Sequence, residues 1–505
     1  MVKAKKSKKV SPFDLQEKKK LMDNFIWDED LILQQKTFTQ FKPDHESFAY
    51  GLLLSKEIPL YDKNKEIIGK DQIKSPVIIT SNRGFVEATK EIEIKNNINF
   101  GSIPTQLESR WSIESIKSYL EGDESIPDID PKELFEKIRK KREDFVFEIN
   151  PIWYKIDTLW DMGTYFYQLC DVYPIREHRG LAGTGKTKKM MISRNISFNA
   201  TEIMVNPSEA SLFRETHDKH PTKYFDEAEK LFRNVKGNLE PDNRVELINS
   251  SYSKGAYVPR IEKIKERYVT IYYDCYSPTQ ISSIRGLFGA TETRAITSIS
   301  TKNLDKDHRG EKEPNKNDPD WRIIRDYLYP FGLKYFKEFE DLYRDDSLYI
   351  DLKIKKRDLQ IWKPLLALAE LIDHTLFLEV VEFAERQSIQ RREDFIPEDH
   401  IDYKTLKIVK EMIGVSEIVR PKEISKRFQD LYDEKFREKV FSNRLDTLGF
   451  KELRKKDMKG SLFLISKESF RIRVEPVCPE LIEKREDSVK IVKIGEKRGS
   501  GGEKG

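Results

Sequence analysis

The sequence predicts an α/β protein with a three-layer core, an α+β region before the core, and a helical lid and a small helix-and-hairpin domain after it. Three observations lead to this division. Residues 180–187 follow the pattern G-x-x-x-x-G-K-T, which joins a strand to a helix in phosphate-binding proteins. A short stretch ending in Asp226 and Glu227 comes next. Residues 402–474 alternate helical and hairpin patterns and carry 19 Lys and Arg against 12 Asp and Glu.

The composition is that of a folded protein of several domains. At 505 residues the chain exceeds one ordinary domain. Hydrophobic residues make up 38% of it, enough for real cores although 35% of the residues are charged. The sequence lacks an apolar run of membrane-spanning length, and no apolar stretch follows the Lys-rich N-terminus, so we expect a cytoplasmic protein without a membrane span. Three cysteines far apart predict neither a disulfide framework nor a zinc site.

The N-terminal region contains no recognisable catalytic constellation. Residues 1–20 hold eight lysines against two acids. They predict a basic flexible arm, which can touch nucleic acid or stay solvated. Residues 21–140 are predicted to form an α+β domain of unknown role. Its clearest signals are a strand at 76–80 and a helix at 131–142 that opens with Asp130 as its cap.

Residues 180–187 predict a phosphate-binding loop for ATP. Glycines let consecutive backbone N–H groups turn inward around a polyphosphate. Lys186 would reach the β- and γ-phosphates, the Thr187 hydroxyl would hold Mg²⁺, and a helix over 188–196 would add its positive end. The residues expected to bind nucleotide here are Gly180, Gly183, Thr184, Gly185, Lys186 and Thr187. The alternative is a glycine-rich turn that matches the pattern by chance.

The strand expected before this loop is unusual. Residues 173–179 are rich in charge, whereas the corresponding strand is normally apolar because it lies in the middle of a parallel sheet. Either the strand is short, or its charges pair with one another at a subunit edge. Residues 145–170, directly before it, predict an aromatic-rich helical stretch packed on a core.

The acidic pair after the loop would supply the second half of an ATPase site. Asp226 would orient Mg²⁺, directly or through water, and Glu227 would polarise the attacking water. An Asp-Glu pair alone is common at helix starts. Its place at the end of a short strand behind a complete phosphate-binding loop favours the catalytic interpretation.

The region after the acidic pair completes the predicted core. A hairpin is expected whose second strand, 267–274, is β-branched and aromatic like a central strand. Ser277 or Thr279 would then stand at its tip, between the metal site and the γ-phosphate. Arg294, directly before a strand at 295–300, can project into the γ-phosphate of a neighbouring subunit. The alternative is a surface arginine at a strand start.

These motifs, in this order, resemble AAA+ ATPases, and in particular the helicase-like AAA+ ATPases of phages, plasmids and archaeal mobile elements. Local stretches at 159–166, 208–214 and 252–256 are similar to theirs. The Arg-Asp-x-x-x-Trp-Lys-Pro-Leu-Leu-Ala-x-Ala stretch at 357–369 is like the lid helix of the family. The resemblance covers residues 100–370.

The resemblance implies an ATPase core over 141–320 and a helical lid over 321–395. It implies a hexameric ring of identical subunits that hydrolyses ATP with Mg²⁺ at the interfaces between subunits. It also implies that Arg357 of the lid touches phosphate.

Residues 398–475 predict a winged helix, three helices followed by a hairpin, whose third helix lies in the DNA major groove. The net charge of 402–474 is +7, against +4 for the whole chain, which favours DNA over protein contact as the use of this domain. The residues expected to face phosphates or bases are Ser442, Asn443, Arg444, Arg454, Lys455 and Lys456. Residues 476–505 predict a largely disordered tail.

Together these features predict a DNA-dependent ATPase, most simply a replicative helicase whose ring pulls single-stranded or forked DNA through a basic pore. Lys263 and Lys265 in a hairpin turn are candidate pore contacts, with a charged surface turn as the alternative. A second hypothesis is an ATP-switched DNA-binding regulator that does not unwind DNA. A third is an ATPase that remodels proteins. The basic C-terminal domain favours the first two.

Overall fold

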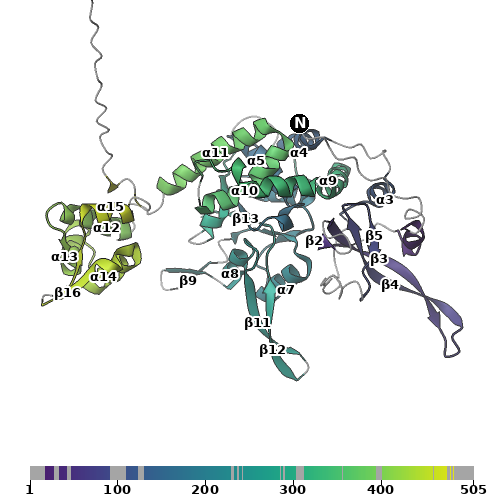
Figure 1. Ribbon diagram of the computed structural model, residues 1–505, viewed down its shortest axis with the longest axis horizontal. Helices are drawn as coiled ribbons and strands as arrows, with labels where there is room; N and C mark the ends of the chain where they lie inside the picture. The colour runs from purple at the N-terminus through teal and green to yellow at the C-terminus, as the bar shows by residue number, and fades with distance from the viewer. Residues whose placement is uncertain are drawn as a thin grey trace, which may run out of the picture. The chain divides into compact units, whose positions relative to one another are not determined.

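The computed structural model divides the chain into two compact units, Met1–Glu385 and Arg386–Gly505, and each is described by itself (Figure 1). The structure describes residues 18–27, 33–41, 47–90, 110–122, 130–228, 232–235, 238–241, 243–264, 266–284, 286–287, 291–302, 312–354, 356–393, 401–458, 460–474, 478 and 481–482. The basic arm as far as residue 17, Lys265 and the tail after residue 482 lie outside these residues.

A five-stranded parallel sheet forms the centre of the first unit. Its strand order is β14-β6-β13-β8-β7, and every neighbouring pair runs parallel. The strands are β6 (Ile175–Arg179), β7 (Ala200–Met204), β8 (Thr222–Phe225), β13 (Thr279–Ser283) and β14 (Ala295–Ile299). The predicted α/β class with a parallel sheet is therefore confirmed.

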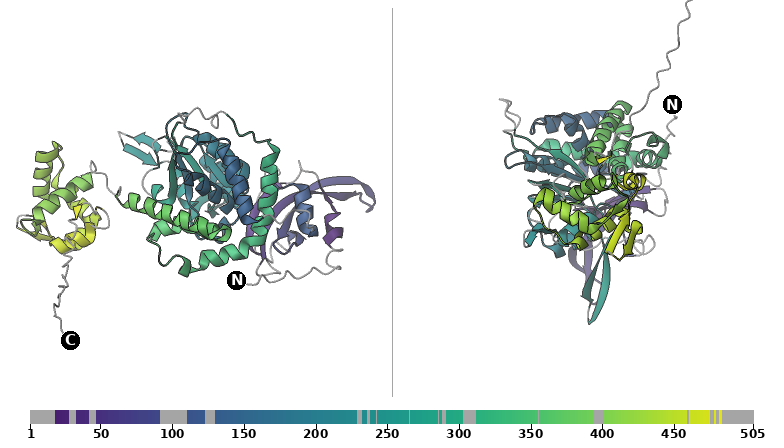
Figure 2. Two further views of the ribbon diagram at one scale, coloured as in Figure 1. Left: turned by 90° about the horizontal axis from the view of Figure 1, so that it is seen from above. Right: turned by 90° about the vertical axis from the view of Figure 1, so that its left-hand side faces the viewer.

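Helices cover both faces of this sheet (Figure 2). They are α5 (Ile152–Gly163), α6 (Lys186–Ile196), α7 (Glu209–Lys219) and α8 (Asn243–Ser250). On the face covered by α7 and α8, Leu212 and Ile248 pack with Ile281 of β13 in one apolar cluster. On the opposite face, Gln280 of β13 donates to Ser193 Oγ of α6 at 3.2 Å. Successive side chains of β13 thus point to opposite faces of the sheet, and each face is covered by helices. The core therefore has three layers: helix, sheet and helix.

β6 is short and charged, and its charges are buried in the middle of the sheet. It lies between β14 and β13, so the expectation that its charges meet at a subunit edge is wrong. Arg176 donates to Asp157 Oδ1 of α5 at 2.6 Å, and Glu177 accepts from Ser283 Oγ of β13 at 2.6 Å. Buried charges persist only when they are paired and hydrogen-bonded. The charges of β6 are tolerated because α5 and β13 present partners to them.

The N-terminal part of this unit is an antiparallel sheet with strand order β1-β3-β4-β5, in which β2 also pairs with β3. Its elements are β1 (Phe25–Ile26), β2 (Leu33–Phe41), β3 (Ser47–Tyr61), β4 (Ile67–Thr80), β5 (Phe85–Glu87) and the following helix α3 (Ile113–Glu121). Tyr50 of β3 packs edge-on against Tyr329 at 5.6 Å between ring centroids, which ties this sheet to the rest of the unit. Helix α4 (Pro131–Glu143) follows and is capped by Asp130, as predicted.

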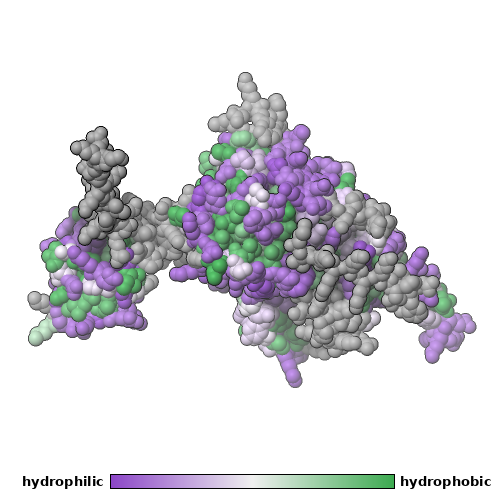
Figure 3. Space-filling model, turned by 45° about the horizontal axis from the view of Figure 1, so that its top comes forward, coloured by the Kyte–Doolittle hydropathy of each residue, from purple (hydrophilic) through white to green (hydrophobic). Residues whose placement is uncertain are grey.

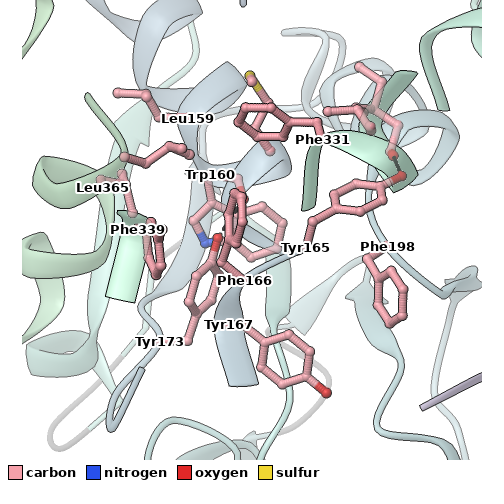
Figure 4. Close-up of a cluster of buried hydrophobic side chains, with 14 of the residues drawn as sticks. Leu159, Trp160, Tyr165, Phe166, Tyr167, Tyr173, Phe198, Phe331, Phe339 and Leu365 are labelled. Carbon is pink, nitrogen blue, oxygen red and sulfur yellow. Dashed lines mark hydrogen bonds between the residues drawn. The ribbon is translucent and has the colours of Figure 1, made fainter. Parts of the chain in front are cut away.

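Three long helices follow the sheet: α9 (Pro319–Arg344), α10 (Lys356–Ile372) and α11 (His374–Glu393). They pack on the aromatic residues around α5 to form the largest apolar core (Figure 4). Phe166 stacks on Phe339 of α9 at 4.7 Å, and Trp160 is completely buried. The predicted packing of the aromatic stretch on a core is confirmed.

Two hairpins leave the core. β9 (Phe232–Val235) pairs with β10 (Asn238–Pro241), and β11 (Tyr257–Ile264) pairs with β12 (Arg267–Asp274). The second hairpin projects away from the sheet in Figures 1 and 2, and Tyr268 and Tyr272 are exposed. The prediction that 267–274 is a central strand is therefore wrong. The central strand is β13, which has Ile281 as its only large apolar residue.

The second unit is a small α/β module. Its elements are α12 (Ile401–Ile413), β15 (Ile418–Val419), α13 (Pro421–Tyr432), α14 (Glu438–Leu445), β16 (Arg454–Asp457), β17 (Gly460–Leu464) and α15 (Lys467–Val474). The strands form an antiparallel sheet in the order β15-β17-β16. Phe428, Phe441 and Phe463 lie at the centre of its separate apolar core.

Hydrophilic residues cover most of the coloured surface visible in Figure 3. In the part of the chain that the structure describes, every helix is too short or too polar to span a bilayer. All three cysteines are buried and reduced, and burial raises the pKa of Cys170 and Cys275.

Candidate nucleotide site

The carboxyl ends of three adjacent strands bring the predicted site together. β6 continues into the loop that begins at Gly180, β8 into Asp226, and β13 ends in Ser282 and Ser283. Because the three strands are parallel and paired in register, these ends lie at one edge of the sheet. In open α/β sheets such an edge is where ligands bind.

The glycines of the loop occupy positions where a residue with a side chain would be strained. A Cβ at Gly180 would stand 2.4 Å from the Ser300 carbonyl oxygen, and Gly183 and Gly185 have φ of +77° and +80°. Helix α6 begins immediately afterwards, two residues earlier than predicted, so its N-terminal N–H groups face the loop. Lys186 Nζ donates to the carbonyls of Gly180 at 2.6 Å and Leu181 at 2.8 Å, which places its ammonium inside the loop.

Thr187 and Asp226 meet across the sheet edge. The Thr187 hydroxyl donates to Asp226 Oδ2 at 2.9 Å. A hydroxyl and a carboxylate are oxygen ligands of the kind Mg²⁺ prefers, and Mg²⁺ usually completes its shell with phosphates and water. This pair fits the expected ion. Among the described residues no group of three or more His, Cys, Asp or Glu side chains is gathered for a metal, so the ion would depend on the nucleotide for the rest of its ligands.

Ser282 is a site residue that the sequence did not reveal. Its hydroxyl donates to Asp226 Oδ1, which also accepts from the Glu227 backbone N–H at 2.9 Å. Ser277 and Thr279, the residues expected at the strand tip, lie instead at the opposite end of β13 and are buried. The expected residues are at the wrong end because the prediction took 267–274, and not β13, as the central strand. The only available signal was the Ser-Ser pair that ends the run after Pro278.

Glu227 is exposed beside Asp226 and has φ of +55°, a left-handed conformation that is rare for a residue with a side chain. Strained backbone of this kind concentrates at functional sites. Glu227 directly follows Asp226 at the carboxyl end of β8, and it is exposed there.

Arg294 and Arg357 lie together at the other edge of the sheet. Arg294 precedes β14, whose first residue pairs with the start of β6. It donates to Asn249 Oδ1 at 3.1 Å, and Arg357 donates to Thr293 Oγ1 at 2.9 Å. Burial and the charge of Arg357 lower the pKa of Arg294. Arg357 therefore lies beside Arg294, and its predicted contact with phosphate stays a prediction.

The six predicted DNA contacts of the second unit divide into three groups. Ser442 is buried on the inner face of α14, so its position excludes a DNA contact. Arg444 and Arg454 are held in ion pairs of 2.6 Å with Asp402 and Asp446. Asn443, Lys455 and Lys456 are exposed, and Arg454 is exposed as well despite its ion pair.

No protein-family model and no curated protein matches the chain. Among solved structures, the chain is similar to "SCCmec type IV Cch - active helicase" with 11% identity, a TM-score of 0.36, and coverage of 89% of this chain and 98% of that one. It is also similar to "The apo structure of NrS-1 C terminal region (305-718)" with 11% identity, a TM-score of 0.32, and coverage of 82% and 96%.

Proposed function

We propose that the protein is an ATP-hydrolysing motor that acts on nucleic acid, a AAA+ ATPase serving as a replicative DNA helicase of a mobile genetic element. The observation that carries the proposal is the meeting of Lys186, Thr187 and Asp226 at one edge of a parallel sheet. The strand order, with β13 between the loop strand and the acidic strand, supports it as well. This arrangement leaves room for a polar residue, Ser282, between the two halves of the site.

The chemistry is transfer of the γ-phosphoryl group to water. Lys186 and the loop N–H groups would hold the phosphates, while Thr187 and Asp226 would hold Mg²⁺, which neutralises developing charge when bound. Glu227 would accept the proton of the attacking water, and Ser282 would fix the orientation of the Asp226 carboxylate. Lys186 and Thr187 lie in the first turn of α6, Asp226 and Glu227 follow β8, and Ser282 lies near the end of β13, which supports these proposed roles.

The two clustered arginines favour a ring of subunits. Arg294 and Arg357 are close enough for each charge to oppose the other, and an anion between them would relieve that repulsion. Because they lie at the sheet edge away from their own loop, that anion would be the γ-phosphate of a neighbouring subunit. In this proposal Arg357, like Arg294, acts across the subunit interface.

Two surfaces would contact nucleic acid. In the second unit, which we take as a winged helix, Asn443, Lys455 and Lys456 are exposed for phosphate and base contacts. In the first unit, the β11–β12 hairpin pairs Lys263 with Tyr268 on one face. An ammonium beside exposed aromatic rings suits a single strand, whose bases stack on aromatic groups.

A strand-displacement assay on forked DNA tests the proposal. The wild-type protein with Mg²⁺ and ATP should release the labelled strand, and Glu227→Gln should not. ATP-dependent binding to a duplex without displacement would instead favour the switched regulator. ATP hydrolysis that ignores DNA would favour a protein-remodelling ATPase.

Mixing two inactive variants tests the ring. Lys186→Ala destroys its own nucleotide site but keeps Arg294, whereas Arg294→Ala keeps an intact site. If Arg294 acts across the interface, mixed assemblies should recover ATP hydrolysis that neither variant has alone. No recovery at any ratio would contradict action across the interface.

A further inference from the structure

The segment after β14 forms a wall of the phosphate-binding loop. The Ser300 N–H donates to the Arg179 carbonyl at 2.6 Å, which continues the β14–β6 pairing up to the start of the loop. The Ser300 carbonyl fills the space that a side chain at Gly180 would need. The path of residues 300–302 is therefore coupled to the shape of the loop.

Lys302 stands over the tip of this loop. A Cβ built on Gly183 would lie 3.9 Å from Lys302 Cε, so the lysine stem passes beside the glycine while its residue remains exposed. Gly183 belongs to the turn in which backbone N–H groups gather around an anion. The side chain of Lys302 therefore lies beside this turn and is a second lysine, besides Lys186, at the loop.

A buried ion pair fixes the position of the wall. Lys189 of α6 is only 1% exposed, and its Nζ donates to Ser300 Oγ at 2.9 Å. The same ammonium is paired with the buried carboxylate of Glu148. Because Lys189 is one helical turn beyond Lys186, this contact joins the first turn of α6 to the segment that carries Lys302.

We propose that Lys302 is an additional binding residue for the nucleotide phosphates, and that Lys189 is a positioning residue that holds Ser300 and hence Lys302 against the loop. The inference rests on the proposed nucleotide site and extends it by a cation that the G-x-x-x-x-G-K-T pattern does not contain. A lysine provides a point charge for phosphate. Its removal should weaken nucleotide binding without abolishing it.

Measured dissociation constants for MgATP test the role of Lys302. Lys302→Ala should raise the Kd about tenfold, the loss expected from one charge-assisted hydrogen bond. The matched control Lys70→Ala removes an exposed lysine of β4 in the N-terminal sheet and should leave the Kd unchanged. An unchanged Kd in Lys302→Ala, while Lys186→Ala still abolishes binding, overturns the inference alone. If the wild-type protein binds no ATP, both this inference and the proposed function are contradicted.

The positioning role of Lys189 is tested by comparing the melting temperature with the Kd for MgATP, because a purely structural role would change the two together. Lys189→Met leaves Glu148 buried without its partner and should lower both the melting temperature and ATP affinity. Lys189→Met with Glu148→Leu removes both charges, so much of the melting temperature should return. The link to Ser300 stays lost, so the raised Kd should persist. If the Kd returns together with the melting temperature, Lys189 has only a structural role and the positioning claim is overturned.

Discussion

Replacing Arg176 with methionine should destabilise the first unit strongly, because the structure gives this buried arginine four hydrogen bonds. They run to Asp157 Oδ1 at 2.6 Å, to the carbonyls of Glu177 at 2.6 Å and Ile296 at 2.8 Å, and to Ser298 Oγ at 2.8 Å. Asp157 is only 2% exposed, so the variant would leave its buried carboxylate without the Arg176 partner. Arg142, whose Nη1 lies 4.0 Å from Asp157 Oδ2, is then the nearby cation. Removing one partner of a buried pair costs about 3–5 kcal/mol.

The double variant Arg176→Met with Asp157→Leu should lose less than Arg176→Met alone, because no charge is left unpaired in the core. We expect a coupling free energy of about 2 kcal/mol or more between the two positions. Urea unfolding followed by tryptophan fluorescence measures both effects, since the Trp153 ring lies 4.8 Å from the Arg176 guanidinium.

The matched control for this cycle is Arg322→Met. Arg322 is 46% exposed and pairs with the exposed Glu114, so its loss should change the free energy of unfolding by less than about 1 kcal/mol. A loss below about 1 kcal/mol in Arg176→Met, or purely additive losses in the double variant, would refute the reasoning.

Three other predictions concern the proposed catalytic base, a buried carboxyl group and two exposed lysines. Glu227→Gln should bind ATP normally and hydrolyse it at least about 100-fold more slowly, as measured by phosphate release, because the water loses its base. Burial raises the pKa of Asp161 from 3.8 to about 6. Between these pH values the folded protein keeps a proton that the unfolded chain has released, so the free energy of unfolding should fall with rising pH by up to about 3 kcal/mol. The difference between wild type and Asp161→Asn, measured by urea unfolding from pH 4 to 6, should show this slope, and a flat difference would contradict it. Replacing Lys455 and Lys456 with alanine should weaken DNA binding and reduce its logarithmic salt slope by about 2, whereas Ser442→Ala should change neither.

The candidate nucleotide site was predictable where its chemistry is local in sequence. The loop at 180–187 and the acidic pair at Asp226 are short patterns whose spacing carries the signal, and the structure brings Thr187 to Asp226. The aromatic stretch around Trp160 was equally clear, because its residues have no stable position outside a core.

The misplaced residues depended on tertiary structure. β13 contains Thr279, Gln280, Ser282 and Ser283 and one large apolar residue, so hydrophobic patterning could not identify it as a central strand. The exposed β12, by contrast, has the β-branched and aromatic composition of a buried strand. This exchange displaced the expected strand tip from Ser282 to the wrong end of β13.

The position of Arg357 also depended on long-range packing. Its place beside Arg294 follows from how α10 meets the turn before β14, which no local pattern records. The same holds for Lys302, which reaches the loop only because β14 pairs with β6.

The rate of ATP hydrolysis with and without single-stranded DNA tests the central claim most directly, with Lys186→Ala as the blank. The account predicts Mg²⁺-dependent hydrolysis that single strands stimulate and that disappears in the blank. A rate that no nucleic acid changes would contradict a nucleic-acid motor. Hydrolysis that survives in the Lys186→Ala protein would contradict the site itself.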